Sequence, residues 1–141
     1  MERVGIITRL DSPRVQQVGS EVAAWLSRQG IEACLDDIAP DMDLLVMLGG
    51  DGTLLHVADQ ASRHGMPGIG INRGKLGFLP DVAEDEMHQA LAEVISGKGN
   101  IEQRMMLKVS LVREGSDDMQ ASRFCLNEVA IVKGNLDKVI R

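Results

Sequence analysis

Residues 43–59 read DLLVMLGGDGTLLHVAD: an apolar run, a turn with three glycines around one aspartate, and a segment with helical spacing of apolar residues. The continuous apolar run at 43–48 is typical of a strand that is buried on both faces of a parallel sheet. The segment 53–65 predicts a helix that ends at Gly65, because glycine is favoured just after the last helical turn. This order places the glycine turn at the carboxyl edge of a sheet.

The rest of the first hundred residues repeats this alternation of strands and amphipathic helices. One helix is expected to begin at Pro13, which suits the first helical position, and to stop at Gly30. The remaining expected elements are strands at 3–8, 31–36 and 67–72 and a helix at 83–99. We therefore expect residues 1–100 to form an α/β domain, an open, mostly parallel sheet flanked by helices.

The pattern changes in the last third of the chain. Residues 106–135 alternate apolar and polar side chains around a polar turn at 114–120, which predicts a β-hairpin. Met105 and Met106 are expected to lie in a core. Because an isolated hairpin is only marginally stable in water, we expect residues 101–141 to be the beginning of a second, β-rich domain, apparently truncated from a longer protein.

Composition excludes several classes of function. The chain has 141 residues, 44% hydrophobic and 26% charged, which predicts a globular fold. Only 2% of the residues are aromatic, the net charge is −6, and there is no basic stripe, so we expect no nucleic-acid partner. No stretch has the length of a membrane span or a signal peptide. Cys34 and Cys125 lack metal-ligand spacing and favour a reducing cytoplasm.

The glycine turn has the composition of a phosphate-binding site. Gly49 and Gly50 carry no Cβ, so backbone N–H groups there can approach an anion. Thr53 is expected to cap the helix, whose N-terminus favours a phosphate, and Gly52 to adopt a dihedral that most residues resist. Asp51 is the exception, because phosphates repel a carboxylate. An aspartate at this position makes sense if its carboxylate accepts a proton from a hydroxyl or holds a magnesium-bound water. The alternative interpretation is that the sequence only forms a turn, in which Asp is a common residue.

Four segments, in order along the chain, resemble the NAD kinase family. They are LGGDGTLLHVAD at 48–59, GINRGKLGFL at 70–79, IEQRMMLKVSL at 101–111 and LNEVAIV at 126–132. GGDGT alone is also similar to diacylglycerol kinases, sphingosine kinases and phosphofructokinases, so the second and fourth segments separate the NAD kinases. The resemblance implies transfer of a phosphoryl group from ATP or polyphosphate to the 2′-hydroxyl of the adenosine ribose of NAD, giving NADP, with a divalent metal such as Mg²⁺.

The resemblance also implies roles for individual residues, with Asp51 as the proton acceptor for the ribose hydroxyl. Asn127 and Glu128 are implied to bind the adenosine ribose, at a point where they interrupt a strand-like segment. His56 and Lys138 are implied to contact the substrate. His56 is equally well explained as a solvated residue, and Lys138 as an ordinary surface lysine. The full set of implied NAD contacts is Asp51, Gly52, His56, Asn127, Glu128 and Lys138, and the implied phosphate-binding turn is Gly49, Gly50 and Thr53. We expect no side chain to be a dedicated metal ligand.

Two departures from the family pattern matter. Pro80 stands where many members carry threonine or serine, so a hydroxyl contact is lost there. The family's C-terminal β-rich domain supplies much of the NAD pocket, so 1–100 is expected to be the nucleotide-binding domain and 101–141 the beginning of the NAD-binding one. The chain alone is then expected to be weak or inactive, and the complete protein a homo-oligomer. The alternatives are another GGDGT kinase and a non-catalytic nucleotide-binding fragment.

Overall fold

The computed structural model describes residues 1–8, 12–72, 79–80, 82–112 and 121–131. The chain divides into two compact units, Met1–Gln103 and Arg104–Arg141. None of the helices in the described ranges combines the length and the apolar character that a membrane crossing requires.

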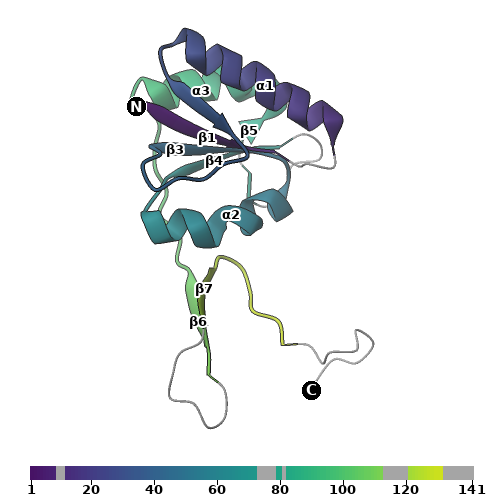
Figure 1. The fold of residues 1–141 in the computed structure, drawn as a ribbon, viewed down its shortest axis with the longest axis vertical. Helices are drawn as coiled ribbons and strands as arrows, with labels where there is room; N and C mark the ends of the chain where they lie inside the picture. The colour runs from purple at the N-terminus through teal and green to yellow at the C-terminus, as the bar shows by residue number, and fades with distance from the viewer. Residues whose placement is uncertain (9–11, 73–78, 81, 113–120, 132–141) are drawn as a thin grey trace. The chain divides into compact units, whose positions relative to one another are not determined.

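The first unit is built on a five-stranded sheet in which every pairing is parallel (Figure 1). The strands are β1 (Arg3–Ile7), β2 (Glu32–Leu35), β3 (Leu44–Leu48), β4 (Gly68–Asn72) and β5 (Val82–Ala83). Their order across the sheet is β2-β1-β3-β4-β5, so the direction of winding reverses between β1 and β3. Ligands of such sheets bind outside the carboxyl ends of the strands at this point. The predicted open parallel sheet is confirmed, and β5 is a further short strand that was not predicted.

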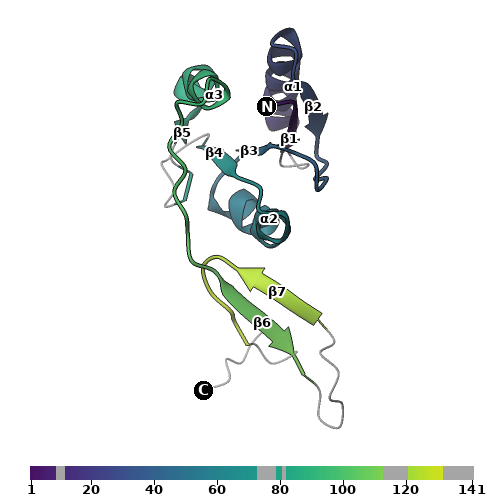
Figure 2. The ribbon, with the colours of Figure 1, turned by 90° about the vertical axis from the view of Figure 1, so that its left-hand side faces the viewer.

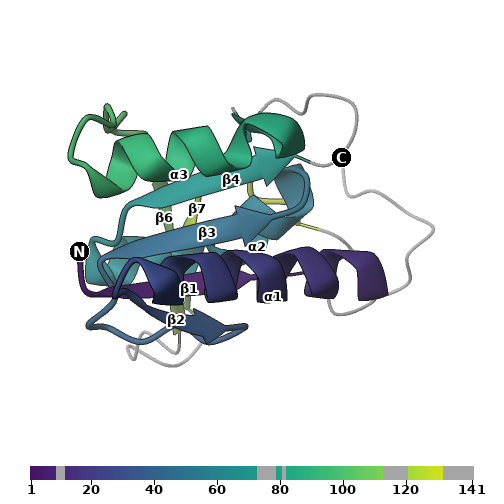
Figure 3. The same cartoon turned by 90° about the horizontal axis from the view of Figure 1, so that it is seen from above.

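Helices cover both faces of the sheet. Helices α1 (Pro13–Arg28) and α3 (Met87–Ile95) lie on one face, and α2 (Asp51–His64) lies on the opposite face (Figure 2 and Figure 3). A 3-10 turn, η1 (Glu84–Glu86), precedes α3, so the helix predicted at 83–99 is shorter at both ends.

The ends of the helices follow the residues that the sequence indicated. Helix α1 begins at Pro13, as predicted, and Gly30 just beyond its end has a φ of +78°. Helix α2 is ended by Gly65 in the left-handed conformation, with a φ of 63°. A glycine is favoured at such a position because it has no Cβ to clash with the backbone.

The central strand β3 has all five residues buried. Leu44, Val46 and Leu48 pack in the cluster under α1 and α3, together with Val22 and Leu91. The two residues between them belong to clusters on the α2 side of the sheet. A strand covered by helices on both faces needs apolar side chains at every position, which explains its uninterrupted apolar run.

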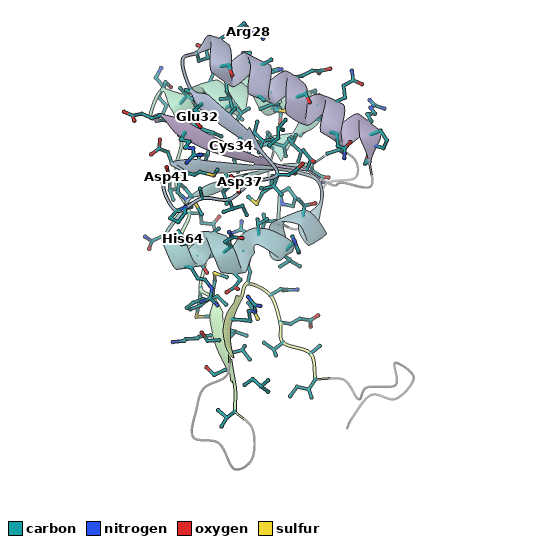
Figure 4. The ribbon with its side chains drawn as sticks, viewed as in Figure 1. Arg28, Glu32, Cys34, Asp37, Asp41 and His64 are labelled. Atoms are coloured by element: carbon teal, nitrogen blue, oxygen red, sulfur yellow. The ribbon has the colours of Figure 1, made fainter. Side chains whose placement is uncertain are left out.

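A network of ion pairs and hydrogen bonds lies at the amino ends of the strands, the edge opposite to the glycine turn. The Arg3 guanidinium donates to both carboxylate oxygens of Asp41 at 2.7 Å, and its Nε lies 3.3 Å from Glu32 Oε1. Figure 4 labels Glu32 on β2 and Asp41 in the segment before β3. The guanidinium holds the pKa of Asp41 below its ordinary value. Two backbone N–H groups at the start of the chain likewise lower the pKa of Asp43.

The second unit contains an antiparallel hairpin of β6 (Leu107–Leu111) and β7 (Ala121–Cys125), as predicted. The prediction that Met105 lies in a core is wrong, because this side chain is 90% exposed. An apolar residue next to a two-stranded sheet has no second layer to pack against unless another element supplies one. Residues 126–131 contain no strand, although their apolar pattern suggested one.

Candidate functional site

The glycine turn lies at the carboxyl end of β3, beside the point where the strand order reverses. Gly49 is buried, and its N–H donates to the carbonyl of Ile71 in β4 at 3.0 Å. Gly50 is exposed and is the N-cap of α2, with φ −93° and ψ −165°. The first glycine thus anchors the turn to the sheet, and the second one faces solvent.

Two details of the turn differ from the prediction. Helix α2 begins at Asp51, two residues earlier than predicted, so Gly52 has a helical backbone that any residue can adopt. Thr53 does not cap the helix, because the N-cap is Gly50 and no side chain caps α2. The sequence pattern placed the start too late because glycine has a low helix propensity.

Thr53 packs against the turn instead. A Cβ placed on Gly49 would collide with Thr53 Oγ1 and would lie 3.0 Å from Thr53 Cβ. A Cβ placed on Gly50 or Gly52 would meet no atom of the described residues within 4 Å. Among these three glycines, packing therefore requires only the first, and the backbone of the other two is open to an approaching ligand.

Asp51 is the first residue of α2 and is half-buried. Its Oδ1 accepts a hydrogen bond from the backbone N–H of Leu79 at 3.0 Å. The first turn of a helix favours a carboxylate, because backbone N–H groups there carry partial positive charge. The Asp51 carboxylate is thus held by a backbone donor at the carboxyl edge of the sheet.

The other candidates in α2 are accessible to solvent. Gly52 and His56 are both exposed. They are four residues apart and therefore lie on the same side of the helix, one turn from each other. A ligand at the start of α2 can reach both positions.

In the second unit, Asn127 and Glu128 come two residues after the end of β7 and are exposed. They do not interrupt a strand, contrary to the prediction, because β7 ends at Cys125. Lys138 lies outside the described residues. The structure brings the α2 candidates together with the glycine turn, and the Asn127–Glu128 pair belongs to the other compact unit.

The sequence analysis assigned no role to two buried polar residues at the carboxyl edge of the sheet, although one of them, Asn72, lies in the segment 70–79 that resembles the NAD kinases. Asn72 ends β4 and is 8% exposed, and Thr8, directly after β1, is 7% exposed. The Thr8 N–H and hydroxyl bond to the Asp36 carboxylate at 2.6 and 2.9 Å. The available signal for Asn72 was a lone polar residue at the end of an apolar strand, which is unexpected unless it has a partner.

The described residues include no group of three or more His, Cys, Asp or Glu side chains that could hold a metal ion. A Mg²⁺ ion that is bound mainly through a ligand's phosphates needs only one or two protein carboxylates. Asp51, at the glycine turn, fits this second mode of binding.

Comparisons with known proteins identify relatives of this chain. Residues 32–99 match the ATP-NAD kinase N-terminal domain. The chain is 39% identical to an NAD kinase of Heliobacterium modesticaldum over 157 residues, an alignment that covers 100% of this chain and 55% of that protein. The chain belongs to the NAD kinase family. It spans about half the length of the curated relatives it matches.

Solved structures of NAD and NADH kinases share the fold. The yeast NADH kinase complexed with NADH superimposes with a TM-score of 0.75 at 21% identity, over 90% of this chain and 47% of the yeast chain. An NAD kinase from Archaeoglobus fulgidus in complex with ATP gives a TM-score of 0.50 at 22% identity, over 67% of this chain and 37% of the other. At these identities the likeness concerns the fold.

Proposed function

We propose that this chain takes part in the NAD kinase reaction, in which a phosphoryl group passes from ATP to the 2′-hydroxyl of the adenosine ribose of NAD. The observation that carries the proposal is the Asp51 carboxylate, anchored by the Leu79 N–H at the beginning of α2. Membership of the NAD kinase family and the NADH bound to the related yeast kinase support the choice of acceptor.

Asp51 acts as the general base. The Asp51 carboxylate, oriented through Oδ1 by the Leu79 N–H, accepts the proton as the ribose oxygen attacks the γ-phosphorus. The new O–P bond forms while the bond between the γ-phosphorus and the β–γ bridging oxygen breaks, and ADP leaves with that electron pair. Such proton transfer contributes about 10²–10⁴-fold to the rate.

The glycine turn and the first turn of α2 bind the phosphates of the donor. The open backbone at Gly50 and the helix N-terminus favour an anion, while Gly49 and Thr53 hold the turn in shape. The ATP in the related Archaeoglobus structure supports ATP as the donor, and polyphosphate is the donor to compare with it. When bound, Mg²⁺ neutralises phosphate charge, and Asp51 is the residue that would contact it or its water.

The proposed NAD contacts are those that the family resemblance implies. Gly52 and His56 contact it from the exposed side of α2, and Asn127 and Glu128 bind the hydroxyls of its adenosine ribose. The positive charge of Lys138 contributes to substrate binding. We further propose that the complete protein is a cytoplasmic homo-oligomer, in keeping with the free thiols of its two cysteines.

The test is transfer of ³²P from [γ-³²P]ATP to NAD, read as labelled NADP, with NAD binding measured by calorimetry. Asp51→Asn is expected to abolish transfer and to leave the NAD dissociation constant within about threefold of the wild-type value. The control is Asp59→Asn, the same change in the same helix, where the carboxylate pairs with Arg63. Transfer by Asp51→Asn at the wild-type rate would refute the general-base role. NAD binding without any transfer by the wild-type chain would refute catalysis by this chain and leave a binding function.

A further inference from the structure

The close packing of Pro80 on strand β4 has a consequence for Asp51. Pro80 is fully buried. It lies directly over Gly70, because a Cβ placed on Gly70 would be 3.0 Å from both the Cα and the Cβ of Pro80 and 3.4 Å from Leu54 Cδ1. The absence of a side chain at Gly70 is therefore what allows the backbone of Pro80 to approach the sheet.

Pro80 is joined to the residue that holds the carboxylate. The Leu79 N–H donates to Asp51 Oδ1 at 3.0 Å. A proline also restricts the residue before it to extended backbone conformations, because its ring clashes with that residue in the helical region. Both the seating of Pro80 on Gly70 and its ring therefore limit where the Leu79 N–H can point.

We propose that Pro80, seated on Gly70, is a positioning residue that holds the Leu79 N–H against Asp51 Oδ1 and so orients that carboxylate toward the acceptor hydroxyl. This inference rests on the proposed function for its catalytic consequence, while the positioning itself is a property of the free chain. It gives Pro80 a role that does not depend on the hydroxyl that many family members carry at this position.

Strand β4 offers a matched control. Gly68 lies two residues from Gly70, so the two face the same side of the strand. A Cβ on Gly68 would collide only with Met47 Cε, the far end of a flexible side chain, and would lie at an ordinary contact distance of 3.7 Å from the backbone oxygen of Leu45. Gly68→Ala and Gly70→Ala are thus the same chemical change on the same strand, and only the second one displaces Pro80.

The first experiment measures hydrogen exchange of the Leu79 amide by NMR in the ¹⁵N-labelled chain without substrate. Gly70→Ala and Pro80→Ala are expected to lower its protection about tenfold or more, while Gly68→Ala leaves it within about threefold of wild type. Asp51→Ala is expected to lower the same protection, because it removes the acceptor. Equal Leu79 protection in Gly70→Ala, Pro80→Ala and Gly68→Ala would overturn the inference.

The second experiment measures ³²P transfer to NAD at saturating substrates, and NAD binding, in the same variants. Gly70→Ala is expected to reduce the rate about 10- to 100-fold with the NAD dissociation constant within about threefold, because a displaced base costs rate rather than affinity. Weaker NAD binding at an unchanged rate would overturn the inference. Absence of transfer in the wild-type chain would refute catalysis by this chain alone, and the exchange comparison would still decide whether Pro80 positions the Leu79 amide.

Discussion

Two adjacent glycines in one turn should respond in different ways to the same substitution. In Gly49→Ala the new Cβ would collide with Thr53 Oγ1 and lie 3.0 Å from Thr53 Cβ, in a residue that is already buried. In Gly50→Ala the new Cβ would have no neighbour within 4 Å in the part of the chain that the structure describes, and the backbone at φ −93° and ψ −165° suits an alanine. Overpacking should therefore be confined to the first variant.

The size of each effect follows from these contacts. Overpacking a close-packed site costs about 1–3 kcal/mol of unfolding free energy, which we expect for Gly49→Ala. Gly50→Ala should change stability by less than about 1 kcal/mol, because the loss of entropy in the unfolded chain offsets a less favourable N-cap residue. For a unit of this size each kcal/mol shifts the melting temperature by about 4–8 °C, so the two variants should separate clearly.

Thermal unfolding followed by the fluorescence of Trp25 measures this difference, because the sole tryptophan lies in α1 of the first unit. Thr53→Ala should recover part of the loss caused by Gly49→Ala, with a coupling energy of about 0.5–3 kcal/mol in the double-mutant cycle. Gly50→Ala should weaken ATP binding in calorimetry and shift the melting temperature less than Gly49→Ala does. Equal melting temperatures for the two alanine variants would refute the assignment of separate packing and binding roles.

Three further predictions concern the scaffold. Asp43→Asn should lower the melting temperature near pH 7, and the difference from wild type should shrink as the pH falls below the ordinary pKa of an aspartate. The pKa of Asp43 is lower in the folded protein than in the unfolded chain. The Asp43 carboxylate therefore stabilises the fold above its unfolded-state pKa, and this stabilisation is lost as the pH falls through its folded-state pKa. Melting temperatures measured at several pH values check this. Leu48→Ala should cost about 2–5 kcal/mol in urea unfolding, because Leu48 is fully buried, whereas Leu55→Ala on the exposed side of α2 should cost less than about 1 kcal/mol. His88→Ala should change the emission of Trp25, whose ring centroid lies 5.3 Å from that of His88, and an unchanged spectrum would contradict the contact.

The parallel sheet could be predicted because its signal is local and strong. The run Leu44–Leu48 has no polar position, and such a run fits a strand that is covered on both faces. Pro13 and Gly65 mark helix ends for steric reasons that act within a few residues. Strand β5 has two residues, too few to show any periodicity, and it exists only because it pairs with the end of β4.

Features that depend on tertiary contacts could not be predicted in the same way. The exposure of Met105 depends on whether a second layer covers the hairpin, and its own sequence neighbourhood carries no such information. The hydrogen bond between Leu79 and Asp51 joins residues 28 positions apart, so no motif spacing reveals it. The sequence also placed the start of α2 too late. The low helix propensity of glycine disfavours a helix at Gly52, but α2 already begins at Asp51.

The composition of the turn is therefore better explained by function than by folding. A fold that needed only the bend would keep Gly49, where a Cβ collides, and could place other residues at positions 50 and 52, where a Cβ meets none of the described atoms within 4 Å. In the first turn of a helix, alanine in place of Gly52 would gain up to about 1 kcal/mol of helix propensity. Retaining glycine there forgoes stability and keeps the backbone beside Asp51 bare. Forgone stability of this kind is expected where a ligand must come close to the main chain, as the proposed phosphoryl transfer requires.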